Sequence, residues 1–153
     1  MVRIGLISDT HGLMRPEALR QLAGSDFIVH GGDIGGQEIL DQLGAIAPVT
    51  AVRGNNDYAP WAGKVPECAT LQIGAIAIYA IHDIGLLPSD IAGSGIGVVV
   101  YGHSHRPLIE ERAGVLYLNP GSAGPRRFKL PVSVGELVID GSELSARIIE
   151  LAV

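Results

Sequence analysis

The sequence Val98-Val99-Val100-Tyr101-Gly102-His103-Ser104-His105 joins a run of β-branched residues to two histidines. Such an apolar run is typical of a strand that is buried on both faces of a sheet. Side chains two residues apart point to the same side of an extended chain. We therefore expect His103 and His105 to face one small volume beyond the carboxyl end of a strand, where open α/β sheets bind ligands.

The first third of the chain repeats this arrangement of an apolar run followed by polar residues. We expect strands over residues 2–8, 26–30 and 48–52. Between them we expect a helix that has Pro16 in its first turn and is closed by Gly24, and another from about Gln37 to Leu43. The segments that follow the three strands are Asp9-Thr10-His11-Gly12, Gly31-Gly32-Asp33 and Arg53-Gly54-Asn55-Asn56-Asp57. The alternation indicates βαβ units with parallel strands and right-handed crossovers.

The second half of the chain is mostly β. Residues 68–73 and 75–81 alternate around Gly74 as a hairpin does, and His82-Asp83 closes the second run. Residues 86–95 predict at most a helical turn or two. Further strands are expected over residues 108–111, 115–118, 132–140 and 143–151, with a hairpin signal at Asp140-Gly141-Ser142. We therefore expect two sheets packed face to face with helices outside.

The composition narrows the class of protein. The 153 residues are enough to bury one core, so we expect a single domain over residues 1–153. Charged residues make up 18%, against roughly 25% in an average protein, and part of so thinly charged a surface would suit a homo-oligomer contact. The formal charge of −5 and the low aromatic content of 5% argue against a nucleic-acid partner.

Targeting signals and the cysteine count bear on the compartment. The chain has no run of about 18 apolar residues, so we expect no membrane span. Asp9 interrupts the N-terminal apolar run after one strand length, which argues against a signal peptide and favours a cytoplasmic protein. The single cysteine, Cys68, fits a reducing compartment. We interpret it as a packing residue because it lies in a stretch in which apolar and polar side chains alternate.

Polar side chains that follow strands form the candidate site. They are Asp9, His11, Asp33, Asn55, His82, His103 and His105. His30 is the one histidine left over, and we interpret it as a hydrogen-bonded core residue. Packing imidazoles and carboxylates together without cations carries a heavy desolvation cost. The sequence therefore predicts bound cations at these strand ends.

The chemistry of these side chains indicates the kind of cation. Ligands of nitrogen and oxygen without thiolate suit Mn²⁺, Zn²⁺, Ni²⁺, Fe or Co²⁺, with manganese favoured, and disfavour Ca²⁺. Two divalent ions bring four positive charges and two aspartates remove two, which leaves a centre of about +2 that attracts anions. Two metals about 3.5–4 Å apart generate a hydroxide nucleophile and clamp the oxygens of a displacement at phosphorus.

These motifs resemble the signature of the calcineurin-like metallophosphoesterases. The matching residues are Asp9-x-His11, Gly32-Asp33, Gly54-Asn55, His82 and Gly102-His103-x-His105. Asn119-Pro120-Gly121-Ser122, with Pro125-Arg126 after it, is similar to the closing motif of the small bacterial and archaeal phosphodiesterases of that superfamily. The resemblance implies a four-layer α/β/β/α sandwich of two mixed sheets with helices outside.

The resemblance also implies how the ligands are divided. One metal would take Asp9, His11, Asp33 and His105. The other would take Asp33, Asn55, His82 and His103. Asp33 would bridge the two.

The sequence departs from the family pattern at two positions, and a third residue has two readings. Asn56 stands where the family often has a histidine; an amide donates a hydrogen bond to developing charge but cannot deliver a proton. Asp83 follows His82 where glycine is common; it either orients an imidazole or is a turn residue, and we favour the turn. Arg126 either contacts the substrate phosphate or has a surface role.

Two functions fit this pattern. The first is a dinuclear metal-dependent phosphoesterase that hydrolyses a small phosphoester, preferentially a diester, by a metal-bound hydroxide. The second is a protein-interaction module like the retromer subunit of this fold, whose metal site is eroded. The complete set of ligand residues in this chain favours the enzyme.

Overall fold

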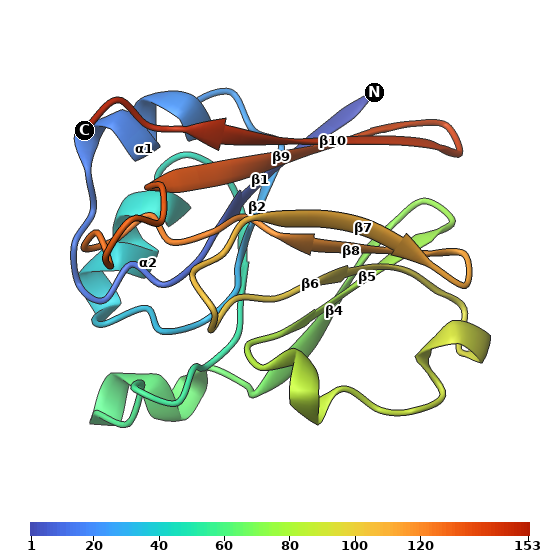
Figure 1. The fold of residues 1–153 in the computed structure, drawn as a ribbon, viewed down its shortest axis with the longest axis horizontal. Coiled ribbons are helices and arrows are strands. Elements are labelled where there is room, and N and C mark those ends of the chain that lie inside the picture. Colours follow the sequence, from blue (N-terminus) through green and yellow to red (C-terminus); the bar gives the residue numbers. More distant parts are fainter.

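The computed structural model describes residues 1–153 and contains two five-stranded mixed sheets packed face to face (Figure 1). The first sheet has the order β10 (Glu143–Glu150), β9 (Ser133–Asp140), β1 (Val2–Ile7), β2 (Phe27–His30), β3 (Val49–Ala51). The second has the order β4 (Cys68–Ile73), β5 (Ile76–Ile81), β6 (Ile96–Val100), β8 (Val115–Asn119), β7 (Leu108–Arg112).

The βαβ pattern of the first third of the chain is confirmed. Strand β1 pairs in parallel with β2, and β2 pairs in parallel with β3. The helices α1 (Pro16–Leu22) and α2 (Gln37–Gly44) make the crossovers. A proline suits the first turn of α1, where its missing N–H has no intrahelical partner to lose. Ile39 and Leu43 on α2 are buried in the core beneath the sheet.

The expected strand over Val98–Val100 lies in the middle of the second sheet. It pairs in parallel with β5 on one side and β8 on the other. All three valines are fully buried. Val98 and Val100 belong to the core between the sheets, whereas Val99 packs on the outer face with Ile91 and Tyr117. The strand is therefore buried on both faces, as its composition predicts.

The predicted four-layer α/β/β/α sandwich is confirmed, and its fourth layer is thin. Helices α1 and α2 pack on the first sheet. Over the second sheet the covering elements are only the 3₁₀ turns η2 (Ile84–Leu86) and η3 (Ile91–Gly93). Another 3₁₀ turn, η1 (Pro60–Lys64), was not expected from the sequence. None of the helices is long and apolar enough to cross a membrane.

The interpretation of Cys68 as a packing residue is wrong. Cys68 begins the edge strand β4, and its side chain is exposed. Side chains alternate between the two faces of a strand. Ala69 and Leu71 take the face that packs on the core between the sheets, so Cys68 has the opposite phase and points outward.

The parallel strands bring the polar segments to one edge of the sandwich. Asp9 and Asp33 follow the parallel strands β1 and β2, and Asn55 follows β3. In the second sheet His82 follows β5 and His103 follows β6, again after parallel strands. Because parallel strands end at the same edge, each sheet contributes its part of the predicted site there.

Candidate metal centre

Two groups of side chains could each hold a cation. The first group is Asp9, His11 and His105, whose ligand atoms lie within 4.8 Å of one another. The second group is Asp9, Asp33 and His82, with the same separation. Asp9 belongs to both groups, so the two form one continuous centre across the edge of the sandwich.

The first group has the spacing of ligands around a single ion. Nε2 of His11 lies 3.4 Å from Nε2 of His105, which is itself 3.4 Å from Oδ1 of Asp9. Two ligands that each lie about 2.1 Å from one ion are separated by roughly 3–3.5 Å. The three side chains therefore converge as a metal ion requires.

Asp33 belongs to the second group and also faces the first. Its Oδ2 atom is 3.3 Å from Nε2 of His82 and 3.7 Å from Nε2 of His11. The carboxylate thus faces an imidazole of each group. This is the position that a bridging ligand would occupy.

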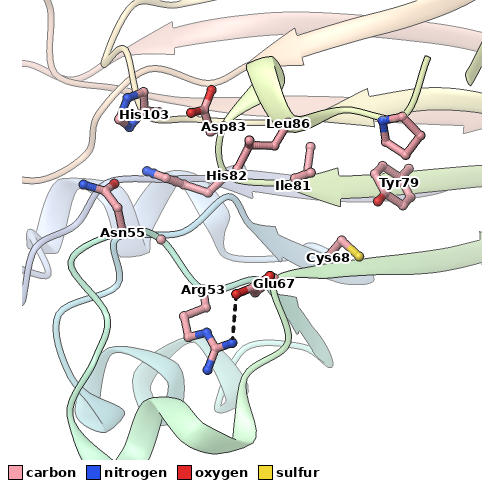
Figure 2. Close-up of a pocket in the computed structure, with 12 residues that line it drawn as sticks. Arg53, Asn55, Glu67, Cys68, Tyr79, Ile81, His82, Asp83, Leu86 and His103 are labelled. Atoms are coloured by element: carbon pink, nitrogen blue, oxygen red, sulfur yellow. Dashed lines mark hydrogen bonds and ion pairs between the residues drawn. The ribbon is translucent and has the colours of Figure 1, made fainter.

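His103 and Asn55 lie beside His82. The rings of His82 and His103 meet edge to face, with their centroids 5.2 Å apart. Figure 2 shows Asn55, His82 and His103 together at one end of a cavity of about 380 Å³. All seven sequence-predicted ligand residues are therefore gathered at this edge, with His103 beside His82 and His105 beside His11 and Asp9.

The backbone of the site residues is unusual. Asp9, His11, Asp33, His103 and His105 all have positive φ, between 48° and 72°. Non-glycine residues rarely adopt this left-handed conformation, which persists where the surrounding structure enforces it. The extended-chain argument for His103 and His105 is wrong, because both lie in a loop after β6. Their rings reach the site through left-handed turns instead.

Hydrogen bonds hold these turns in place and fix the carboxylate of Asp9. Ser8 Oγ donates to Asp9 Oδ2 at 2.7 Å, and the His103 N–H donates to the same oxygen at 3.2 Å. The Asp9 N–H donates to the carbonyl of Gly32, and the His11 N–H donates to the carbonyl of Asp33. One carboxylate oxygen of Asp9 is therefore fully engaged, and the other faces the site.

Three buried polar atoms at this centre have no hydrogen-bond partner. They are Asp9 Oδ1, His82 Nε2 and His105 Nδ1. Unpartnered buried polar atoms are rare in folded proteins and call for a specific explanation. Divalent cations fit the first two, since a carboxylate oxygen and an imidazole nitrogen are both common metal ligands and both atoms face the site.

The electrostatics of Asp33 favour its ionised form. Burial acts to raise the pKa of Asp33, but the adjacent imidazole of His82 and hydrogen bonds from Asn56 outweigh it and hold the pKa below its ordinary value. For His82, burial acts to lower the pKa, and the neighbouring carboxylates of Asp33 and Asp9 raise it above its ordinary value. A carboxylate that stays ionised at neutral pH is what a cation needs.

His30 is a hydrogen-bonded core residue, as expected. It is fully buried, its Nδ1 accepts from the Gly32 N–H at 3.1 Å, and its Nε2 lies 3.0 Å from Thr10 Oγ1. Burial lowers the pKa of His30 to about 4. The neutral ring therefore supports the loops after β1 and β2 without facing the site.

Asp57 is a residue whose role the sequence analysis missed. Its buried carboxylate accepts three backbone N–H groups, from Ile34, Gly35 and Gly54, at 3.0–3.1 Å. It thus ties the loop that carries Asp33 to the loop that carries Asn55. The signal that could have revealed it is its place in the turn segment Gly54-Asn55-Asn56-Asp57, where a carboxylate often accepts backbone donors.

Residues of the motif Asn119-Pro120-Gly121-Ser122 form hydrogen bonds to the loops of the site. Asn119 Nδ2 donates to the carbonyl of Gly102 at 3.1 Å and lies 3.2 Å from Ser104 Oγ. Ser122 Oγ donates to the carbonyl of Asp9 at 3.0 Å. These residues therefore position the loops that carry the histidines.

Three further residues from the sequence analysis have clear places. Asn56 donates from its backbone N–H to Asp33 Oδ1 at 3.0 Å and from its amide to Oδ2 at 3.1 Å. Asp83 accepts the Gly85 N–H at 2.9 Å and caps η2, which confirms the turn. Arg126 donates to the carbonyl of Val153 and also lines a second cavity, of about 270 Å³, with His11 and His105.

A sandwich of two mixed sheets with imidazoles and carboxylates clustered at its strand ends defines an α/β protein with a candidate metal centre. The match to known proteins goes further. The chain belongs to the calcineurin-like phosphoesterase superfamily, since the model of the calcineurin-like phosphoesterase superfamily domain matches residues 2–142. The resemblance inferred from the motifs is thereby confirmed.

Individual relatives agree with this assignment. A probable metallophosphoesterase from Methanocaldococcus jannaschii is 35% identical, and the match covers 97% of this chain and 81% of the relative. The phosphodiesterase YfcE from Escherichia coli K12 is 26% identical, with 90% and 88% covered. The crystal structure of Vps29 from Chaetomium thermophilum superimposes with a TM-score of 0.83 at 20% identity, covering 97% of this chain and 88% of that one. The last likeness shows a shared fold.

Proposed function

We propose that this protein is a dinuclear metal-dependent phosphodiesterase. The observation that carries the proposal is the pair of buried, unpartnered atoms Asp9 Oδ1 and His82 Nε2, which face each other where the two ligand groups meet. Membership of the phosphoesterase superfamily and the match to a relative named as a phosphodiesterase support the choice of substrate.

The proposed ligand sets extend the two groups and share Asp33, instead of Asp9, between them. Asp9, His11, Asp33 and His105 would hold one ion. Asp33, Asn55, His82 and His103 would hold the other, with Asp33 in common. The ligand atoms are nitrogen and oxygen, and among the ions that suit them we favour Mn²⁺. Bound divalent ions would supply Lewis acidity to the phosphate and lower the pKa of a water molecule toward neutrality.

Asn56 and Arg126 are the proposed substrate-binding groups. The Asn56 amide has one N–H engaged with Asp33, so its second N–H is free to donate to a phosphate oxygen. It cannot protonate a leaving group. Arg126 lines the cavity beside His11 and His105. Its guanidinium donates one hydrogen bond within the protein, to the carbonyl of Val153. Its remaining donors are free for a phosphate oxygen.

The alternative is a non-catalytic scaffold that acts as a protein-interaction module. The fold shared with Vps29 is the reason to consider it. A scaffold has no need for an intact ligand set. In this chain every proposed ligand is present and converges on the same edge, which favours the enzyme.

The experiment that separates the two is hydrolysis by protein that has been stripped of metal and then reconstituted. We expect metal-free protein to be inactive towards bis(p-nitrophenyl) phosphate, and Mn²⁺ to restore hydrolysis. We expect p-nitrophenyl phosphate, the matching monoester, to be a poorer substrate. The His103→Ala variant, reconstituted in the same way, should hydrolyse the diester more slowly than the wild type by orders of magnitude. Inert wild-type protein with Mn²⁺, Zn²⁺, Ni²⁺ and Co²⁺ supplied in turn would favour the scaffold.

A further inference from the structure

The larger cavity extends well beyond the proposed metal ligands. From Asn55, His82 and His103 it runs along the start of β4 and the end of β5 (Figure 2). Its volume of about 380 Å³ falls within the roughly 300–1,000 Å³ of small-molecule sites. A phosphate group bound at the metal centre would fill only its inner end. The rest of the cavity is therefore available to whatever is esterified to that phosphate.

One wall of this cavity is apolar. Tyr79, Leu86 and Pro88 line it, and Leu86 is 73% exposed. Covering this exposed leucine surface with a ligand removes apolar area from water, which lowers the free energy of the complex. Tyr79 adds an aromatic surface, and the Cys68 thiol beside it, together with burial, raises the pKa of the phenol to about 12, so the ring stays uncharged. This wall suits a flat or apolar group.

The opposite side offers hydrogen bonds but no surplus of positive charge. Arg53 donates to Glu67 at 3.3 Å, and both residues line the cavity (Figure 2). The guanidinium has further donors and the carboxylate a second acceptor. Asp83 also lines the cavity, so two acidic residues stand against one basic residue. An additional anionic group would be disfavoured here.

The smaller cavity has the contrary character. It lies against His11 and His105, and Arg126 and Arg127 line it with no acidic residue. The two cavities therefore differ in charge on the two sides of the metal centre. This asymmetry gives the two ester groups of a diester different surroundings.

We propose that the larger cavity is a substrate subsite that binds one ester group of the phosphodiester, an uncharged ring-bearing alcohol of nucleoside size. The proposal rests on the proposed function and specifies its substrate class. The ring would pack on Tyr79 and Leu86, and its polar edge would bond to Arg53 and Glu67. A methyl group would leave both walls uncovered.

The test uses two diesters that differ only in this group. The p-nitrophenyl ester of thymidine 5′-monophosphate and methyl p-nitrophenyl phosphate share one leaving group and one charge. We expect kcat/KM for the thymidine ester to exceed that for the methyl ester by about tenfold or more, because covering apolar surface favours its transition state. A ratio near one, with the methyl ester hydrolysed, would overturn the subsite and leave the proposed function standing.

The single cysteine allows the cavity to be blocked selectively. Cys68 is exposed and lines the cavity, so N-ethylmaleimide will add a bulky group there. We expect this modification to bring the thymidine-to-methyl ratio close to one in the wild type. In Cys68→Ala the reagent should have no effect on the ratio. In Cys68→Ala/Ser142→Cys the label sits on the hairpin between β9 and β10, in the other sheet, and the ratio should again be unaffected. A high ratio that survives labelling of Cys68 would place the selectivity elsewhere and overturn the proposal.

A binding measurement keeps the subsite testable without catalysis. Thymidine 5′-monophosphate, with Mn²⁺ present, should slow the alkylation of Cys68 about fivefold or more when its subsite is saturated, whereas methyl phosphate should not. If neither ester is hydrolysed, the proposed function fails, and protection by the nucleotide would still support the subsite. Alkylation at equal rates with and without the nucleotide would overturn the subsite.

Discussion

Asp9 Oδ1 and His82 Nε2 lie 3.9 Å apart, and both atoms are buried without a hydrogen-bond partner. The other oxygen of Asp9 is engaged by Ser8 and the His103 N–H, so the carboxylate is held with one oxygen directed at the imidazole. Leaving such groups unpaired in the interior costs about 1–3 kcal/mol each. Two cations, one bound by Asp9 and the other by His82, would remove that cost.

The protein should therefore be more stable with metal than without it. A ligand that binds only the folded state adds about 2.7 kcal/mol at a hundred times its dissociation constant. We expect Tm of chelator-treated protein to rise by several degrees on addition of Mn²⁺, Zn²⁺, Ni²⁺ or Co²⁺. Ca²⁺ at the same concentration is the control and should raise it much less. Melting curves that are the same with and without each transition metal would contradict this prediction.

Gly54 should be intolerant of a side chain. A Cβ atom at this position would lie 2.1 Å from Asp33 Oδ1, so the carboxylate would have to move. A displacement of about 1 Å at a reacting centre can cost about 10²-fold in rate, and we expect Gly54→Ala to lose activity on that scale. Gly44 at the end of α2 has open space around it, so Gly44→Ala is the matched control and should keep its activity. The check is kcat/KM for a diester in both variants; equal values would show that Asp33 has room to adjust.

Stability should fall in acid through Glu136. Burial acts to raise the pKa of Glu136, but hydrogen bonds from Arg3 and Arg147 outweigh it and hold the pKa below its ordinary value of 4.5. A carboxyl whose folded pKa is depressed stabilises the protein above its unfolded pKa, and this contribution is lost as the pH falls through the folded value. For this partly exposed group we expect about 1 kcal/mol.

The measurement is urea unfolding of wild type and Glu136→Gln between pH 3 and 7, with chelator present throughout. The free-energy difference between them should be constant from pH 6 to 7 and shrink below about pH 4.5. A difference that does not change over the whole range would mean that Glu136 has the same pKa in the folded and unfolded protein.

Asn56 should make the rate depend on the leaving group. General acid catalysis contributes typically about 10²–10⁴-fold, most for strongly basic leaving groups, and an amide cannot provide it. We expect kcat/KM of the wild type to fall steeply across diesters of rising leaving-group pKa. Asn56→His should help alkyl esters more than aryl esters. A flat wild-type series, or an equal gain for both kinds of ester, would show that position 56 has another role.

Much of the fold follows from local patterns. The valines of β6 predict a doubly buried strand, and the polar residues after successive parallel strands predict a shared site. The backbone of the site does not follow from them. Asp9, His11 and Asp33 adopt left-handed conformations because backbone hydrogen bonds between distant loops hold them there. Local sequence preferences do not predict such hydrogen bonds.

Other features were missed for related reasons. Asp57 is important through three N–H groups, two of them from a loop more than twenty residues away, and sequence spacing cannot display such contacts. Cys68 lies in a strand whose side chains alternate between two faces, and only one face packs on the other sheet. The sequence alone does not tell which face that is, so it does not tell whether Cys68 is exposed. Both outcomes are set by tertiary packing.

The most direct test of a dinuclear centre is the number of metal ions that the protein holds. We expect elemental analysis of protein reconstituted with Mn²⁺ and then desalted to give two ions per chain. The Asp33 carboxylate faces an imidazole of each ligand group, so Asp33→Ala should hold fewer ions and lose hydrolysis while keeping the circular dichroism spectrum of the wild type. One ion or none in the wild type, or a full complement with full activity in Asp33→Ala, would contradict the account.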